Sequence, residues 1–377
     1  MDRPSPQRRV GTLGRRGYRE LVALLGLLSF GSSIASSFWV VYLAGELGLP
    51  SALIASLYAV GLFVAALGAM MLTRVRSVHA TRTMISGIAC LAATQLALAF
   101  LRGPALHVSF AVLFGAYIPL FFLPWNVLLT SETQPHDRGA KFGGINLAFS
   151  LASVAAPLVG GLLAARFGFQ TLFLVSSGIL ALAAIVTAVL AQPFERVSFG
   201  WAPTMLGRGT TTAFLAQGGI DGVLVTAIPL ATFSFVTGKT ELGALFALFA
   251  LSGGLISVVL GRISDRIRRR RRFIALGVGI SVPTVLAVGL APILSVFAVS
   301  NGALSATLAI APTFVTVMAA DRLVGQPGAL MATREILLNL SRGSTSVLVL
   351  VGYGLGVPAQ LMILLVAVLL PFELFAS

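Results

Sequence analysis

The sequence contains little charge for its length. Only 10% of the 377 residues are charged and 57% are hydrophobic, whereas about 25% of the residues of an ordinary soluble domain are charged. Acidic residues are the scarcer of the two charged classes. The 26 Lys and Arg against 12 Asp and Glu give a formal net charge of +14. A soluble fold of this size needs far more polar surface. The charge must therefore lie in short segments between long apolar ones, which is typical of a polytopic membrane protein.

Residue types that carry catalysis are also scarce. The single cysteine, Cys90, cannot form an intrachain disulfide, and the histidines His79, His107 and His136 do not have metal-ligand spacing. No serine has a plausible base nearby, which argues against a membrane enzyme acting on lipids. No phosphate-binding glycine loop occurs, which argues against a nucleotide-driven pump. The sequence therefore predicts neither enzymatic activity nor a cofactor or metal.

What the sequence does contain is long hydrophobic runs. A bilayer core about 30 Å thick needs roughly 20 apolar residues per helix. The expected spans are 21–44, 51–72, 83–101, 106–130, 142–165, 169–191, 209–236, 242–260, 273–290, 293–319, 330–352 and 358–375. A basic tail (1–20) precedes them, and a linker (192–208) separates a first six-helix bundle (21–191) from a second (209–377). This predicts an all-α polytopic membrane protein with twelve transmembrane helices in two pseudo-symmetric bundles.

Basic residues predict the orientation, because cytoplasmic loops retain Lys and Arg. With the N-terminus inside, 21 of the 26 basic residues fall in the tail and inner loops, and only Arg102, Arg166 and Lys239 fall in outer loops. We therefore expect a multi-pass protein of the cell (cytoplasmic) membrane with both termini in the cytoplasm. The basic run GRISDRIRRRRRF (261–273) then lies on an inner loop, where it contacts anionic lipid headgroups. Nucleic-acid binding is disfavoured, because no aromatic or glycine-rich recognition pattern accompanies these arginines.

The two predicted halves share short patterns. An E-L-G triplet follows the first span and the seventh span, and each triplet runs directly into the next apolar helix. A spacing of eight separates Arg138 from Asn146 in the first half and Arg334 from Arg342 in the second. Two parallel repeats related by an axis along the membrane normal place a binding site near the midplane, between the halves.

The start of the basic run, GRISDRIRRR, resembles the inner-loop signature of the major facilitator superfamily, with Gly261, Asp265 and Arg266 in register. The corresponding loop after the second span, TRVRSVHATRT, has no acid. We expect Asp265 to accept hydrogen bonds at the helix start near Arg138, and Arg266 to pair with Asp321. Such contacts exist only while the inner ends are together, so they would bias one of two arrangements. A permanent surface salt bridge is the alternative.

The fifth span is similar to a motif that the family's antiporters carry. It has Gly143, Pro157, Gly160 and Gly161 at the spacing of that motif, with alanine at two of its other glycine positions. The family's arginine within the fourth span is missing, since Arg102 lies outside that span, and this puts proton coupling in question. The resemblance covers nearly the whole chain and implies a secondary transporter.

Charges inside a bilayer are costly and tend to be functional. Asp221 lies near the middle of the seventh span between glycines, and Glu335, Asn339 and Arg342 share one face of the eleventh. Asp221 is either a protonatable site or an acid permanently paired with Arg342, and Glu335 with Asn339 either pair locally or join the transport site. The other polar side chains expected at the cavity are Asn146 and Asn301.

So few polar groups predict a largely apolar cavity, with phenylalanines such as Phe30, Phe38, Phe121 and Phe122 available to line it. Such a cavity favours an apolar or cationic substrate over a sugar. The family resemblance implies alternating-access transport of a small amphipathic or apolar molecule, and the fifth-span motif implies export. An uptake transporter of the same fold, or a transport-inactive membrane sensor or assembly protein, is the alternative. The expected partners are this substrate, protons as a coupling ion, and membrane lipids, and we expect a monomer.

Overall fold

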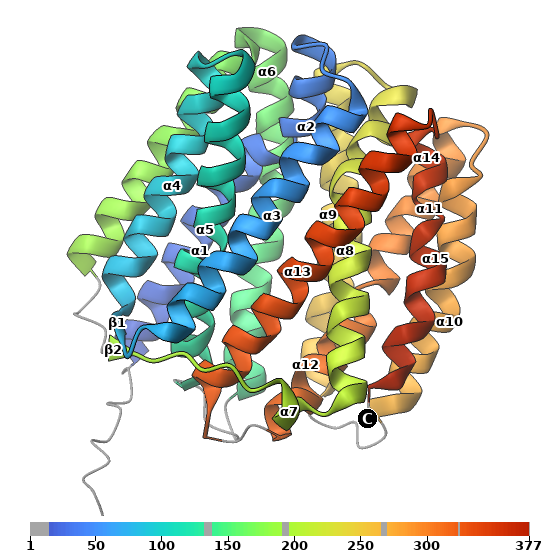
Figure 1. Cartoon of the computed structure of the whole chain (residues 1–377). Coiled ribbons are helices and arrows are strands. Elements are labelled where there is room, and N and C mark those ends of the chain that lie inside the picture. Colours follow the sequence, from blue (N-terminus) through green and yellow to red (C-terminus); the bar gives the residue numbers. More distant parts are fainter. Residues whose placement is uncertain (1–14, 132–137, 191–195, 265–269, 323–324, 377) are drawn as a thin grey trace, which may run out of the picture.

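The computed structural model describes residues 15–131, 138–190, 196–264, 270–322 and 325–376. Within these ranges the chain forms long helices that lie side by side along one direction, and a single short two-stranded sheet (Figure 1). Helices predominate because a helix bonds every interior backbone group within itself, which an apolar environment requires. Ten of the described helices are long and apolar enough to cross a membrane.

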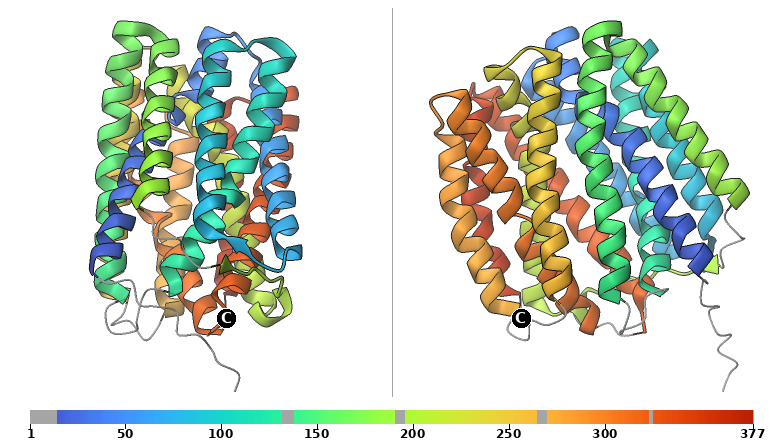
Figure 2. Two further views of the ribbon diagram at one scale, coloured as in Figure 1. Left: turned by 90° about the vertical axis from the view of Figure 1, so that its left-hand side faces the viewer. Right: turned by 180° about the vertical axis from the view of Figure 1, so that it is seen from behind.

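The first bundle contains five of these long apolar helices. Its elements are α1 (Arg15–Ser36), α2 (Trp39–Val41), the π-helical η1 (Tyr42–Glu46), α3 (Ser51–Arg74), α4 (Ala80–Phe100), α5 (Gly103–Ser131) and α6 (Arg138–Leu190). The first three follow one another without a break in the apolar span, which runs over Val22–Glu46. α6 comprises two spans, because Gly168 adopts a φ of 81° that only glycine accepts readily, and the chain turns back there (Figure 2).

The second bundle has the same number of spans. Its elements are α8 (Arg208–Phe235), α9 (Lys239–Ser264), α10 (Arg270–Gly289), α11 (Leu294–Thr307), α12 (Ile310–Arg322), α13 (Pro327–Gly354), α14 (Ala359–Met362), α15 (Leu365–Leu369) and the 3₁₀-helix η2 (Leu370–Phe375). α11 and α12 together make one span, and the last three make a shorter one, Ala359–Phe375. Counting the two spans of α6 and this last short segment, the twelve predicted helices are all present.

The two bundles are joined by β2 (Arg196–Val197) and α7 (Pro203–Leu206). β2 pairs antiparallel with β1 (Val78–His79), which lies between α3 and α4. We call the end of the molecule that carries β1, β2, α7 and the C-terminus the linker face. The end that carries η1 and the start of α9 is the opposite face (Figure 1).

α6 and α9 belong to different bundles and approach each other closely through glycine. A Cβ atom at Gly161 would lie 2.6 Å from the carbonyl oxygen of Lys239, and one at Gly243 would overlap the carbonyl oxygen of Pro157. Gly160, on the adjoining face of α6, leaves the same kind of room for Ile34 of α1. Small residues let membrane helices come close enough for backbone contact. The predicted fifth-span motif therefore lies where α6 packs against its neighbours.

A second contact between the bundles joins α3 to α13, where Gly343 packs against the ring of Phe63. At the opposite face, Lys239 Nζ lies 2.6 Å from Glu46 Oε1 and 4.5 Å from the centre of the Phe169 ring. This ion pair also crosses from one bundle to the other. Its side chains are 30% and 46% exposed, so it contributes at most about 1 kcal/mol.

Gly161→Leu should destabilise the fold, because the larger side chain would push α9 away from α6. Overpacking of this kind costs about 1–3 kcal/mol. The matched control is Gly178→Leu on the same helix, where nothing lies within 4 Å of the added Cβ. Thermal unfolding in detergent should show a lower Tm for Gly161→Leu and an unchanged one for Gly178→Leu. Equal Tm values for the two variants would show that the close approach is not required.

Candidate functional site

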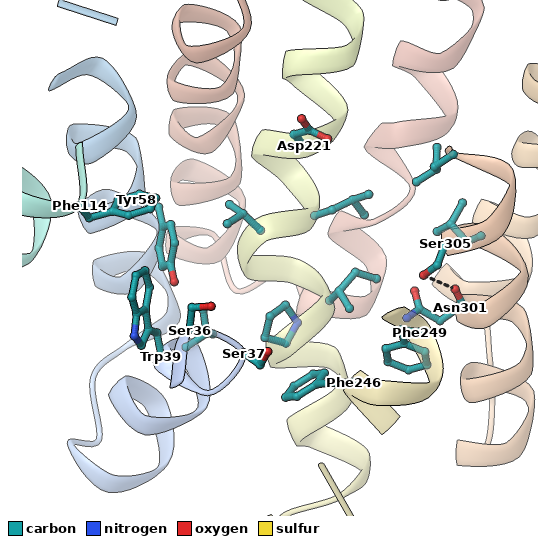
Figure 3. A pocket seen from close by; sticks show the side chains of 17 residues that line it. Ser36, Ser37, Trp39, Tyr58, Phe114, Asp221, Phe246, Phe249, Asn301 and Ser305 are labelled. Carbon is teal, nitrogen blue, oxygen red and sulfur yellow. Dashed lines mark hydrogen bonds between the residues drawn. The ribbon is translucent and has the colours of Figure 1, made fainter. Parts of the chain in front are cut away.

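A cavity of about 530 Å³ lies between the two bundles (Figure 3). Its lining residues are Ser36, Ser37, Trp39, Val40, Tyr58, Phe114, Asp221, Leu224, Val225, Ile228, Pro229, Phe246, Phe249, Asn301, Leu304, Ser305 and Leu308. They come from the first, fourth, seventh and tenth spans, together with the second and the eighth. The third, sixth, ninth and twelfth spans contribute none, so the cavity is central.

Aromatic rings from both bundles form much of the cavity wall. Trp39, Tyr58 and Phe114 come from the first bundle, and Phe246 and Phe249 from the second. Trp39 and Tyr58 both meet the Phe114 ring edge-on, with ring centres 5.6 Å apart in each pair. These rings give a ligand apolar faces that also attract positive charge.

The indole of Trp39 is held in place by a hydrogen bond to a neighbouring helix. Its Nε1 donates to Oε1 of Gln95 on α4 at 3.0 Å, and the Gln95 side chain is fully buried. A buried hydrogen bond of this kind holds the ring in one orientation. The aromatic wall is therefore a preformed surface.

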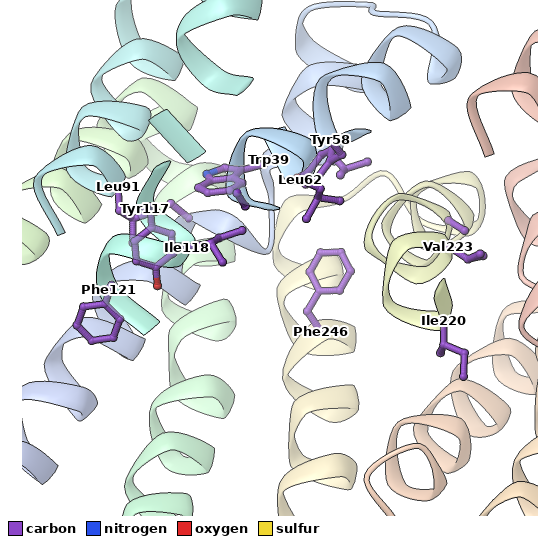
Figure 4. Close-up of a cluster of buried hydrophobic side chains, with 14 of the residues drawn as sticks. Trp39, Tyr58, Leu62, Leu91, Tyr117, Ile118, Phe121, Ile220, Val223 and Phe246 are labelled. Atoms are coloured by element: carbon purple, nitrogen blue, oxygen red, sulfur yellow. The ribbon is translucent and has the colours of Figure 1, made fainter. Parts of the chain in front are cut away.

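The phenylalanines predicted from the sequence do not line the cavity. Phe38 and Phe121 are fully buried in the core. Phe38 packs edge-on against Phe246 at 5.7 Å, and Phe121 stacks on Trp125 at 5.9 Å. Figure 4 shows Phe121 beside Tyr117. Phe30 and Phe122 are partly buried against the same core. The prediction was wrong because, in a helix that is apolar all round, composition does not show which face points inward.

Asp221 is the only acid that lines the cavity among the described residues. It pairs with Arg342, whose Nη2 and Nε lie 2.7 and 3.2 Å from Oδ2. Both contacts are made by the same carboxylate oxygen, so Oδ1 has no bond to a described residue. The Asp221 side chain is 42% exposed and that of Arg342 only 22%. The pair therefore presents its negative member to the cavity.

Glycines on α8 bring these two residues together. A Cβ at Gly218 would lie 2.5 Å from the carbonyl oxygen of Leu338, and one at Gly222 would overlap the backbone of Arg342. The close approach is reinforced by Ser346 Oγ, which donates to the Gly222 carbonyl at 3.1 Å, and by Ser341, which donates to α8 in the same way. The side chain of Asp221 can thus reach α13 without leaving the cavity wall.

A chain of polar contacts continues from the ion pair along α13. Arg342 Nη1 donates to Asn339 Oδ1 at 3.1 Å, and Asn339 Nδ2 donates to the backbone oxygen of Glu335 at 2.8 Å. Glu335 Oε1 in turn accepts from Arg334 Nη1 at 2.9 Å. The Arg334 guanidinium lies over the Phe214 ring at 5.9 Å. Two acids and two arginines therefore neutralise each other, with Asp221 on α8 and the other three on α13.

Of the predicted cavity residues, Asp221 and Asn301 line the cavity. Arg342, Asn339 and Glu335 are brought together as expected but lie behind Asp221, and Asn339 and Glu335 are buried. The structure shows the pairing of Asp221 with Arg342 that one interpretation predicted. The other interpretation, a protonatable Asp221, stays a prediction. Sequence reasoning missed the aromatic residues of the cavity wall, Trp39, Tyr58, Phe114 and Phe246. No pattern in a single sequence would have assigned them to the cavity.

Several predicted residues lie where the structure gives no side-chain detail. Asp265 and Arg266 fall outside the described residues. Arg138, Gly143, Asn146, Gly261 and Asp321 lie within α6, α9 and α12, but their side chains are outside the described part. The proposed inner-loop contacts of Asp265 and Arg266 therefore stay predictions.

Arg342→Ala should destabilise the protein, because it leaves Asp221 and Asn339 without a donor. Removal of one member of a hydrogen-bonded pair costs about 1–3 kcal/mol, and the partial exposure of Asp221 places the cost at the lower end. The second substitution Asp221→Asn in the Arg342→Ala background should recover part of the loss. Chemical denaturation of the two single variants and the double variant gives the coupling energy. Strictly additive effects would contradict a direct interaction.

Comparison with known proteins gives a consistent identification. Residues 21–333 match the Major Facilitator Superfamily. An MFS-type efflux pump of Mycolicibacterium smegmatis is 31% identical over 155 residues, which cover 36% of this chain and 35% of that protein. The crystal structure of the human organic anion transporter MFSD10 (TETRAN) has a TM-score of 0.67 and covers 99% of both chains, at 18% identity, which shows a shared fold.

The family match covers most of the chain, and the fold has ten described helices long and apolar enough to cross a membrane, with a cavity between the two bundles. The protein belongs to the major facilitator superfamily and is a multi-pass membrane protein.

Proposed function

We propose that this transporter exports a small amphipathic organic molecule that carries a positive charge or a strong hydrogen-bond donor. The observation that carries the proposal is Oδ1 of Asp221, which has no bond to a described residue and lies in a wall of aromatic rings between the two bundles. A donor on the ligand can bond to Oδ1 while Arg342 keeps Oδ2, so the ligand need not break the ion pair. The rings of Trp39, Tyr58 and Phe246 would hold its apolar part.

The small number of polar groups on the cavity wall favours this substrate class over a sugar. Apart from Asp221, the polar side chains on the wall are two serines of the first span, Tyr58, Asn301 and Ser305. Ser37 and Ser305 already donate to backbone oxygens of their own helices. Too few donors and acceptors remain to replace the water around several hydroxyl groups. Export, in preference to uptake, is supported by the partial likeness to an efflux pump.

The transport cycle would be a movement of the two bundles relative to each other. We propose that residues 21–191 and 209–377 move as two rigid units joined by the linker at 192–208, and that the cavity opens to each side in turn.

The coupling ion would be a proton at Asp221. A proton on its carboxylate removes the negative charge that attracts both Arg342 and a cationic ligand, so the proton and the ligand compete for one site.

Asp221→Asn should abolish export of a cationic probe, because the amide has no charge and its NH₂ group cannot accept a hydrogen bond. Cells that express the wild-type protein should accumulate less ethidium than cells with Asp221→Asn, by about threefold or more. Ethidium fluorescence measures the accumulation. A matched acid-to-amide control is Glu241→Gln, which removes an exposed carboxylate at the start of α9, outside the cavity, and should export like the wild type.

Export of ethidium by Asp221→Asn at the wild-type rate would contradict the role of Asp221. Equal accumulation in all cells, including those with the wild-type protein, would contradict export of cations. Protein amount in the membrane must be measured for each variant, since reduced folding also raises accumulation.

The linker face should be cytoplasmic, because most of the basic residues outside the spans lie in the tail and loops at that end. Epitope tags at both termini should then be inaccessible to antibody or protease in intact cells and become accessible after permeabilisation. A tag between α1 and α3, near Gly48, should be accessible without permeabilisation. Labelling of a terminal tag on intact cells would reverse this orientation.

A further inference from the structure

The described part of the segment that joins the two bundles contacts both of them. We call residues 196–206 the strap. Its first part contacts the first bundle, because Val197 pairs with Val78 and Arg196 with His79 in the antiparallel sheet. We call this the β contact. It involves two residues from each strand, and the side chains of His79 and Arg196 are exposed.

The next part of the strap contacts the second bundle at the start of α13. A Cβ at Gly328 would overlap the carbonyl oxygen of Ser198, and a Cβ at Gly200 would lie 3.2 Å from that of Ala329. The backbone N–H of Ala202 donates to Thr333 Oγ1 at 2.9 Å, and Thr333 is fully buried. We call this the α13 contact.

Two buried side chains attach the strap further. Phe199, whose backbone adjoins Gly328, is 7% exposed, and Leu206 at the end of α7 is fully buried. α7 contacts both α8 and α12 of the second bundle. The strap thus crosses the linker face from one bundle to the other, and Figure 1 shows it passing below α3 and α13.

We propose that the strap is a releasable lock on the linker face, which stays on α13 and detaches at the β contact whenever the bundles separate there. A cavity that opens toward this face requires the ends of α3 and α13 to move apart. The strap holds both ends, so one of its two contacts must break. The lock would thereby favour the arrangement in which the linker face is closed.

The β contact is the weaker of the two. An isolated pair of strands is marginally stable in water, and this one has only two residue pairs. One of these pairs places His79 opposite Arg196, and these two described side chains form no hydrogen bond or ion pair with each other that would strengthen it. The strap is held on the second bundle more firmly, by the part-buried hydrogen bond to Thr333, the buried side chains of Phe199 and Leu206, and close backbone packing at Gly328.

Disulfides at the two contacts test which one opens. The first pair is His79→Cys with Arg196→Cys. Facing residues of an antiparallel pair have Cα atoms about 4.5–5.5 Å apart, which suits a disulfide. The matched control pair is Gly200→Cys with Ala329→Cys, whose Cβ atoms would be adjacent. Both pairs are made with Cys90→Ser, so that the native cysteine cannot interfere.

Oxidation of the 79–196 pair should reduce ethidium export by about tenfold, and a reductant should restore it. Oxidation of the 200–329 pair should leave export within about twofold of the reduced protein. Full export with the 79–196 disulfide closed would show that the β contact need not open and would overturn the proposal. A block by the 200–329 disulfide would place the release at α13 and would also overturn it.

A distance measurement decides the same question without any substrate. Spin labels at positions 79 and 196 in lipid nanodiscs should give two distance populations, one for the paired and one for the released strap. Labels at the exposed positions 201 and 326 should give one, because strap and α13 stay together. A single short distance for the first pair, or two populations for the second, would contradict the lock. Because this measurement needs no substrate, it tests the lock even if the protein does not export ethidium. Failure of the proposed substrate and failure of the proposed lock can therefore be distinguished.

Discussion

The ion pair between Asp221 and Arg342 is the interaction on which the rest of the site depends. A charge in the hydrocarbon region is costly unless an opposite charge lies beside it. Each of these residues therefore requires the other, and both require α8 and α13 to be close at that depth. Gly218 and Gly222 make the approach possible. The position of one carboxylate then determines where a ligand can be recognised in a cavity that is otherwise mainly apolar.

The contacts between the two bundles are of a different kind. α6 meets α9 through Gly161 and Gly243, and the charged contact across the bundles, Glu46 with Lys239, is partly exposed and weak. At the α6–α9 approach, backbone surfaces without long interlocking side chains can separate and return with little rearrangement of rotamers. Within the second bundle, by contrast, side-chain hydrogen bonds and the ion pair join α13 to α8. This difference supports the proposed movement of the two bundles as units.

The fold could be predicted largely from the sequence, because each apolar run has the length of a bilayer crossing and the runs are separated by charged loops. The turn at Gly168 and the short final span fell close to their expected places. The pairing of Asp221 with Arg342 was one of two predicted alternatives, since charges within apolar helices have few possible partners. The cavity wall was not predicted, because Phe38 and Phe114 occur in equally apolar helices and only tertiary packing distinguishes them. The strand at 196–197 was also missed, although Val197 and Phe199 alternate there with polar residues.

The last span has a consequence for the surrounding lipid. As an ideal α-helix, Ala359–Phe375 would rise about 26 Å, which is shorter than a hydrocarbon core of about 30 Å. However, its backbone bonds at Ile363, Leu364, Val366 and Ala367 reach back three residues, and η2 continues in 3₁₀ form. A 3₁₀-helix rises about 2.0 Å per residue in place of 1.5 Å, so the tighter winding lengthens the segment by several ångströms. The helix itself thus removes most of the hydrophobic mismatch, and the bilayer need not thin around the C-terminal edge of the protein.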